Sequence, residues 1–159
     1  MKIALLTLSS LSLLFLSCER EGSGKCTETN ISTAARSSHN RGEDCSSCHT
    51  SGKKGRGCFT VCGSAFQKDQ KTPMQNAVMV LFTRENDLPD GKITSVSKPI
   101  PFDKSGNFYT TETISFANKY PAIISGKDTS MMSGALTNNA SCNKCHATNG
   151  SQDPIYSQY

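Results

Sequence analysis

The sequence predicts a mainly β protein: a small β-sandwich flanked by two loop or short-helix segments. Between residues 58 and 126, short apolar runs alternate with turn residues, and about seven such runs in about 70 residues are typical of a sandwich. With 159 residues, 35% of them hydrophobic, and no tryptophan, the chain has material for one small core. The formal charge of +4 is weak and scattered, so no nucleic-acid partner is expected.

Residues 1–17 read as an export signal, because Lys2 precedes an apolar stretch too short to span a bilayer. The stretch ends Phe-Leu-Ser before Cys18, which resembles the lipobox of bacterial lipoproteins. That resemblance implies lipidation of Cys18 and contact with the membrane through the lipid anchor only. Glu19 in place of aspartate implies, in a Gram-negative bacterium, the outer membrane, on its periplasmic or surface face. Residues 18–25 then form the anchor and a tether; the alternative is an ordinary signal peptide with a stray cysteine.

Two five-residue motifs carry the chemistry, one in the segment 26–57 and one in the segment 127–159: Cys45-Ser46-Ser47-Cys48-His49 and Cys142-Asn143-Lys144-Cys145-His146. Cys-x-x-Cys-His is the signature of c-type haem attachment. Two thiols about one turn apart reach the two vinyl groups of the porphyrin, and the next residue supplies the proximal imidazole. The sequence therefore predicts two covalently bound haem c groups, with His49 and His146 as iron ligands. Export supports this prediction, because bacteria attach haem covalently outside the inner membrane.

The sixth iron ligands have few candidates. His39 is the third and last histidine of the chain, so at most one haem can be bis-histidine within one molecule. Met131 and Met132 are the methionines nearest the second motif, and either is a candidate thioether ligand. The alternatives are a solvated loop for His39 and packing roles for both methionines, with an open position or a ligand from a neighbouring molecule at the iron.

The segment 58–126 is expected to form the sandwich. Residues 76–83 are almost continuously apolar and predict a central strand buried on both faces, with Met79 in the core. Residues 103–106 predict a tight turn in which Gly106 takes a positive φ. Further strands are expected at 58–66, 93–96, 100–102, 107–111, 113–116 and 120–125, with a turn at 85–92, and residues 126–133 are expected to leave the sandwich.

Three cysteines lie outside the motifs and the lipobox: Cys26, Cys58 and Cys62. Cys58 and Cys62 are not a third haem site, because Gly63 stands where histidine is required. In one extended strand they lie about 13 Å apart, at about 3.3 Å per residue, too far to bridge each other. A disulfide from Cys26 to one of them is expected in an oxidising envelope, which leaves one thiol unpaired.

Three stretches, Val61–Phe66, Pro73–Val80 and Phe102–Phe108, resemble the immunoglobulin-like sandwich of the transthyretin-like and carboxypeptidase-regulatory families. Over residues 38–146 the chain resembles bacterial c-type cytochromes in which such a sandwich lies between two haem segments. The resemblance implies electron transfer with other redox proteins or cytochromes as partners.

The sequence therefore predicts an exported, lipid-anchored dihaem cytochrome and no enzyme, because no Ser/His/Asp constellation and no spare histidine exists for acid–base chemistry. An odd number of strands would separate the haems by a strand length, about 17–20 Å, and require head-to-tail contacts between molecules. An even number would place them side by side.

Two other hypotheses stay open. One is an adhesive surface lipoprotein whose Cys45, Cys48, Cys142 and Cys145 form a four-thiolate zinc site. The other is a haem-based sensor or peroxidase with an open iron position.

Overall fold

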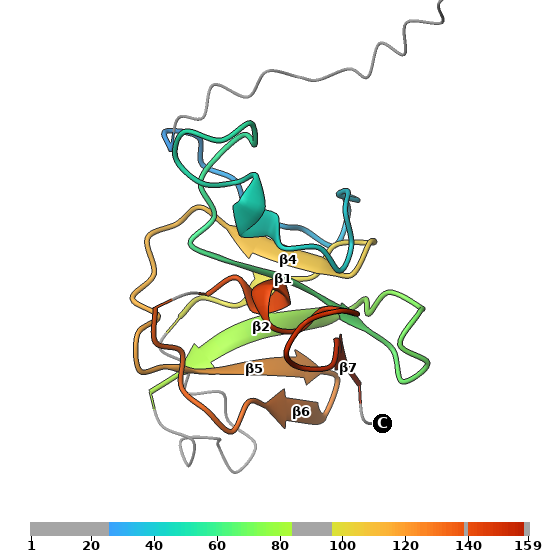
Figure 1. Ribbon diagram of the computed structural model, residues 1–159. Helices are drawn as coiled ribbons and strands as arrows, with labels where there is room; N and C mark the ends of the chain where they lie inside the picture. The colour runs from blue at the N-terminus through green and yellow to red at the C-terminus, as the bar shows by residue number, and fades with distance from the viewer. Residues whose placement is uncertain (1–25, 84–96, 139, 158–159) are drawn as a thin grey trace, which may run out of the picture.

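Two β-sheets form the fold in the computed structural model, which describes residues 26–83, 97–138 and 140–157 (Figure 1). One sheet has the strand order β4-β1-β7 and the other the order β3-β2-β5-β6. The strands are β1 (Val61–Phe66), β2 (Ala77–Phe82), β3 (Ile100–Pro101), β4 (Asn107–Thr110), β5 (Tyr120–Ser125), β6 (Asp128–Met131) and β7 (Ile155–Tyr156). The prediction of a mainly β, sandwich-like fold is confirmed.

The core lies between the two sheets. β1 contributes Val61 and Ala65, β2 contributes Met79 and Leu81, and β4 contributes Phe108, all nearly or fully buried. These residues alternate along their strands, as the period of two in a β-strand requires. Met79 is therefore a core residue, as predicted.

The strand β2 is central in its sheet and is buried on both faces. It pairs antiparallel with β5 along its whole length and with β3 at one end. On the face away from the main core, Val80 and Phe82 form a second apolar cluster with Ala122. The near-continuous apolar run that predicted this strand reflects this two-sided burial.

Some elements differ from the sequence prediction. Residues 113–116 form no strand, and β6 returns against β5 through Gly126 (φ +62°) instead of leaving the sandwich. The strand β7, in the tail after the second motif, pairs parallel with β1 and was not predicted. The expected strand at 93–96 and the turn at 85–92 lie outside the described residues. The turn at 103–106 is confirmed, with Gly106 at φ +75°.

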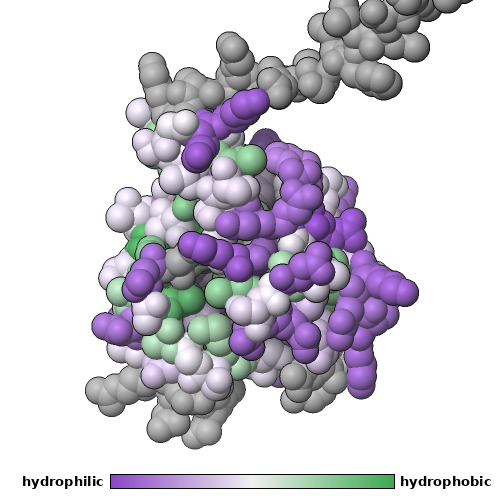
Figure 2. Space-filling model, viewed as in Figure 1, coloured by the Kyte–Doolittle hydropathy of each residue, from purple (hydrophilic) through white to green (hydrophobic). Residues whose placement is uncertain are grey.

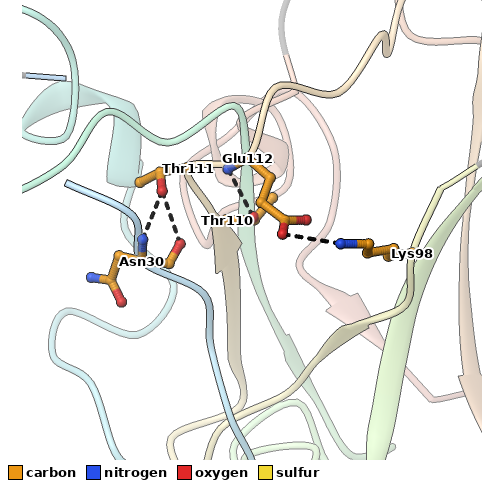
Figure 3. A network of polar contacts seen from close by, with 5 residues as sticks. All are labelled: Asn30, Lys98, Thr110, Thr111 and Glu112. Carbon is orange, nitrogen blue, oxygen red and sulfur yellow. Dashed lines mark hydrogen bonds and ion pairs between the residues drawn. The ribbon is translucent and has the colours of Figure 1, made fainter. Parts of the chain in front are cut away.

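The N-terminal segment is fastened along β4 and the loop that follows it. Asn30 donates its backbone N–H to Thr111 Oγ1 at 2.7 Å, and Thr111 donates back to the Asn30 carbonyl at 3.2 Å (Figure 3). In the same loop, Glu112 forms an ion pair with Lys98 at 3.4 Å. The two bonds between Asn30 and Thr111 hold the chain that leads to the first Cys-x-x-Cys-His motif against the sheet.

A disulfide joins Cys26 to Cys58 and closes the segment that contains the first motif. This confirms the predicted pairing of Cys26 with one of the two strand-region cysteines. Cys62, the other one, is a free thiol in β1 and only 1% exposed. Within the described residues no helix is long and apolar enough to cross a membrane.

Candidate functional site

The first motif folds as a single tight turn on the outside of β1. Cys45–Ser47 form the 3-10 helix η1, capped by Asp44, whose side chain accepts the Ser46 N–H at 3.0 Å. The backbone N–H groups of Cys48 and His49 both bond to the Cys45 carbonyl. The turn therefore brings the two thiols and the imidazole of one motif together within five residues.

The second motif repeats this geometry. Cys142–Lys144 form the 3-10 helix η3, with Ser141 at its N-cap position. The N–H groups of Cys145 and His146 bond to the Cys142 carbonyl, as their counterparts do in the first motif. Two segments about a hundred residues apart thus adopt the same local fold, which indicates that the motif sequence itself specifies it.

Each motif histidine is held through the same ring nitrogen. His49 Nδ1 lies 3.0 Å from the carbonyl oxygen of Arg56, and His146 Nδ1 lies 2.9 Å from that of Asp153. Both carbonyls are seven residues downstream. Because a carbonyl only accepts hydrogen bonds, Nδ1 carries a proton, and in the neutral imidazole Nε2 then keeps its lone pair. This is the tautomer of a metal-ligating histidine whose outer nitrogen is fixed by a backbone carbonyl.

Aromatic rings also fix the first imidazole. Phe59 stacks on His49 with ring centroids 4.0 Å apart and an interplanar angle of 7°, and Tyr109 stacks on Phe59 at 4.7 Å. Burial and the neighbouring His39 lower the pKa of His49, against the opposing hydrogen bonds from backbone carbonyls. His49 is therefore neutral at pH 7, the form that binds metal.

His39 lies in the same site as the first motif. A cavity of about 280 Å³ is lined by Cys45, Cys48, His49 and His39 together. The centroids of the His39 and His49 rings are 5.9 Å apart, with an interplanar angle of 29°. The structure thus brings together the residues that the sequence named as proximal and candidate distal ligands of the first haem.

A larger cavity, of about 640 Å³, opens beside the second motif. Its lining includes Cys142, Cys145 and His146, and both Met131 and Met132. Figure 2 shows hydrophobic residues gathered on the face turned to the viewer, with hydrophilic residues above them and to their right. Apolar lining residues contributed by the sheet and the following loop include Pro121, Ile123, Ala135, Leu136 and Ile155. A cavity of this size and polarity suits a large planar apolar cofactor.

The two methionines differ in their packing. Met131 packs against the cluster of Val80, Phe82 and Ala122 on the outer face of its sheet. Met132 packs against the main core, as does Cys142 of the second motif. Neighbouring residues of an extended chain point to opposite faces, so the two side chains are not equivalent.

The two motifs lie side by side. Ser141, at the N-cap position of η3, donates its hydroxyl hydrogen to Asp44 Oδ1, the carboxylate that caps η1. Asp44 lines the first cavity and Ser141 lines the second, so this one bond joins the walls of both. Although burial opposes ionisation, hydrogen bonds from Ser141 and Ser46 hold the pKa of Asp44 below its usual value. The sequence left open whether the two motifs lie a strand length apart or side by side, and the structure has them side by side.

The motif thiols do not converge on one point. Within the described part of the chain, no group of three or more His, Cys, Asp or Glu side chains is arranged to hold a metal ion. Cys48 and Cys145 are exposed and line different cavities. Burial raises the pKa of Cys142 to about 12, so this thiol is protonated at neutral pH. A four-thiolate zinc site would require the two motifs to move relative to each other.

Several residues of the site were not identified from the sequence. The carbonyls of Arg56 and Asp153 belong to no motif, because a backbone acceptor can come from any residue type. Phe59 was predicted only as a residue of the strand 58–66, although an aromatic side chain ten residues after His49 was an available signal. Cys18, the candidate lipidation site, lies outside the described residues.

No model of a protein family matches this chain, and neither a curated protein nor a solved structure does. The site geometry therefore carries the functional argument.

Proposed function

We propose that this protein is an exported, lipid-anchored dihaem c-type cytochrome that transfers electrons. One observation carries the proposal: both Cys-x-x-Cys-His motifs fold alike, with the histidine proton fixed on Nδ1 by a carbonyl seven residues downstream. A structural cysteine pair has no need of an imidazole held in the iron-binding tautomer. The same arrangement occurs twice, each time beside a cavity, and this repetition strengthens the support for the proposal.

Each motif would hold one haem through its own residues. Cys45 and Cys48, and likewise Cys142 and Cys145, supply the thioether sulfurs, while His49 and His146 bind through Nε2. Haem iron held in this way supplies one-electron oxidation and reduction. The protein's part is to orient each imidazole, exclude water with an apolar wall and keep the porphyrin edge open to a partner.

The packing differences favour particular candidates for the sixth ligands. His39 shares the first cavity with His49 and is the candidate for a bis-histidine site. Met132 packs with the core beside Cys142, while Met131 packs on the outer cluster, so Met132 is the better candidate at the second site. A methionine ligand raises the reduction potential relative to a second histidine, so the two sites would differ in potential.

Adjacent motifs make electron exchange within one molecule the expected route. The Asp44–Ser141 bond joins the two sites, so a head-to-tail contact between molecules is not required to connect them. The anchor on Cys18 would hold the protein at the outer membrane of the envelope, where other redox proteins or cytochromes act as partners. No substrate chemistry is proposed.

The test is the mass and haem content of the chain purified from a host with intact cytochrome maturation. We expect the mass of the processed chain plus two haems, and haem staining that survives a denaturing gel. Cys45→Ala with Cys48→Ala should remove one haem, and Cys142→Ala with Cys145→Ala the other. A chain without bound haem, or with stoichiometric zinc bound to its thiols, would refute the proposal and favour the adhesive lipoprotein.

A further inference from the structure

Two thiols from distant parts of the sequence, Cys45 and Cys62, lie next to each other beneath the first motif. Cys62, in β1, lies close enough to Cys45 that each thiol shifts the pKa of the other, and its S–H donates to Ser141 Oγ at 3.5 Å. Its backbone N–H bonds to the Ala140 carbonyl at 3.0 Å, which fixes its position below the second motif as well. Ser141 in turn bonds to Asp44, the residue before Cys45. Cys62 is therefore held against the first motif by two independent paths.

Cys62 has no part in the proposed haem attachment. Its side chain is 1% exposed and it is not part of the Cys26–Cys58 disulfide. Among the cysteines that the structure describes, it is the one that belongs neither to that disulfide nor to a Cys-x-x-Cys-His motif. A buried thiol in contact with a half-buried thiol is a preformed pair for disulfide formation. Disulfide formation would bring the two neighbouring sulfurs to a bond length of about 2.05 Å.

We propose that Cys62 is the disulfide partner of Cys45 whenever the chain carries no cofactor, so that an oxidising envelope closes the first site. The bond would occupy the sulfur that otherwise forms a thioether. Haem attachment at the first motif would then require prior reduction, while the second motif would stay open. This consequence for haem rests on the proposed function, but the disulfide itself does not.

The chemistry balances with a small-molecule disulfide such as oxidised glutathione. The Cys45 sulfur attacks one glutathione sulfur, which forms a mixed disulfide and releases one glutathione thiol. The Cys62 sulfur then attacks Cys45 of the mixed disulfide, which forms the protein disulfide and releases the second glutathione thiol. Two protein thiols lose two electrons and two protons, and one molecule of oxidised glutathione gains them.

The order of attack follows from the thiols' surroundings. The neighbouring Cys62 thiol lowers the pKa of Cys45, even though burial opposes this, and Cys45 is the more accessible of the two. The neighbouring Cys45 thiol and burial raise the pKa of Cys62, so Cys62 does not react first with an external disulfide. Once Cys45 is in a mixed disulfide, the effect of its thiol on the pKa of Cys62 is lost.

The test uses the full-length exported chain from a host that lacks haem attachment. The protein is reduced, treated with oxidised glutathione, alkylated in denaturant and digested with trypsin without reduction. Cleavage after lysine and arginine places Cys45 in the peptide 42–53, Cys62 together with Cys58 in 57–68, and Cys26 in 26–36. We expect a three-peptide product in which 57–68 is joined to both of the others.

Matched variants identify the bond. Cys45→Ser and Cys62→Ser should each reduce the product to the pair 26–36 and 57–68, whereas Cys48→Ser should retain all three peptides. Overturning results are an alkylated Cys62 with a Cys45–Cys48 bond inside 42–53, or Cys62 joined to the peptide that carries Cys142. No haem enters the assay, so its failure is distinct from failure of the proposed cytochrome function.

Discussion

Loss of the Cys26–Cys58 disulfide is expected to destabilise the fold by several kcal/mol. The bond spans 32 residues and encloses the whole first motif. For a loop of about 32 residues the chain-entropy relation gives about 12 cal/mol/K, or about 3.7 kcal/mol at 25 °C. Most of the enclosed segment lacks regular secondary structure, so few other backbone bonds would replace the constraint.

Urea unfolding of the wild type and of Cys26→Ser/Cys58→Ser measures this loss. With a slope of about 1–3 kcal/mol/M, the midpoint should fall by more than about 1 M. Each single variant should cost as much as the double variant, because either substitution breaks the same bond. A loss below about 1 kcal/mol, or additive single effects, would refute the view that the disulfide orders the first site.

Three further outcomes follow from the site. Asp44→Asn should lower the free energy of unfolding by about 1–3 kcal/mol at pH 7, because it weakens the cap of η1 and the bond to Ser141. The pKa of Asp44 is depressed in the folded state, so this contribution is present above the unfolded pKa near 3.8 and is lost as the pH falls below that value. The unfolding curves of wild type and variant should therefore converge in acid. Gly63→Ala places a Cβ 2.6 Å from Phe108 Cζ and should lower the thermal midpoint by an amount equivalent to about 1–3 kcal/mol. Met132→Ala should convert one haem from low to high spin in the visible spectrum, whereas an equal effect of Met131→Ala would contradict the assignment.

The strands that were predicted from the sequence share one property: they bury enough apolar side chains to leave a recognisable apolar pattern in the sequence. Residues 120–125 were predicted with the bounds that β5 has, and 76–83 with those of β2 to within one residue at each end. The strand β6 reads Asp-Thr-Ser-Met and is half exposed, so its pairing with β5 left no apolar pattern. Residues 113–116 alternate like a strand, but Ile114 and Phe116 pack on the core from a loop. Alternating apolar residues indicate that one side of a segment is buried. They do not show that its backbone pairs with a neighbouring strand.

The spacing of the two Cys-x-x-Cys-His motifs was enough to name the cysteines and histidines of the candidate site. The covalent attachment of haem to them stays a prediction. The bonds that orient the histidines involve backbone carbonyls, which no side-chain pattern reveals. The Asp44–Ser141 bond joins residues 97 positions apart, and the contact of Cys62 with Cys45 depends on how β1 passes beneath η1. Contacts between residues so far apart in the sequence become visible only in the folded structure.

The spans of the hydrogen bonds have a consequence for the order of assembly. The bonds that hold each imidazole reach only seven residues along the chain, and loops of about ten residues close within about 10–100 ns. Joining the two ends of the molecule requires ordering the intervening sheets, at a much larger entropic cost. If the chain is exported and binds haem as proposed, each motif would therefore fold before the strands have paired, and the contact between the two motifs would form late in maturation.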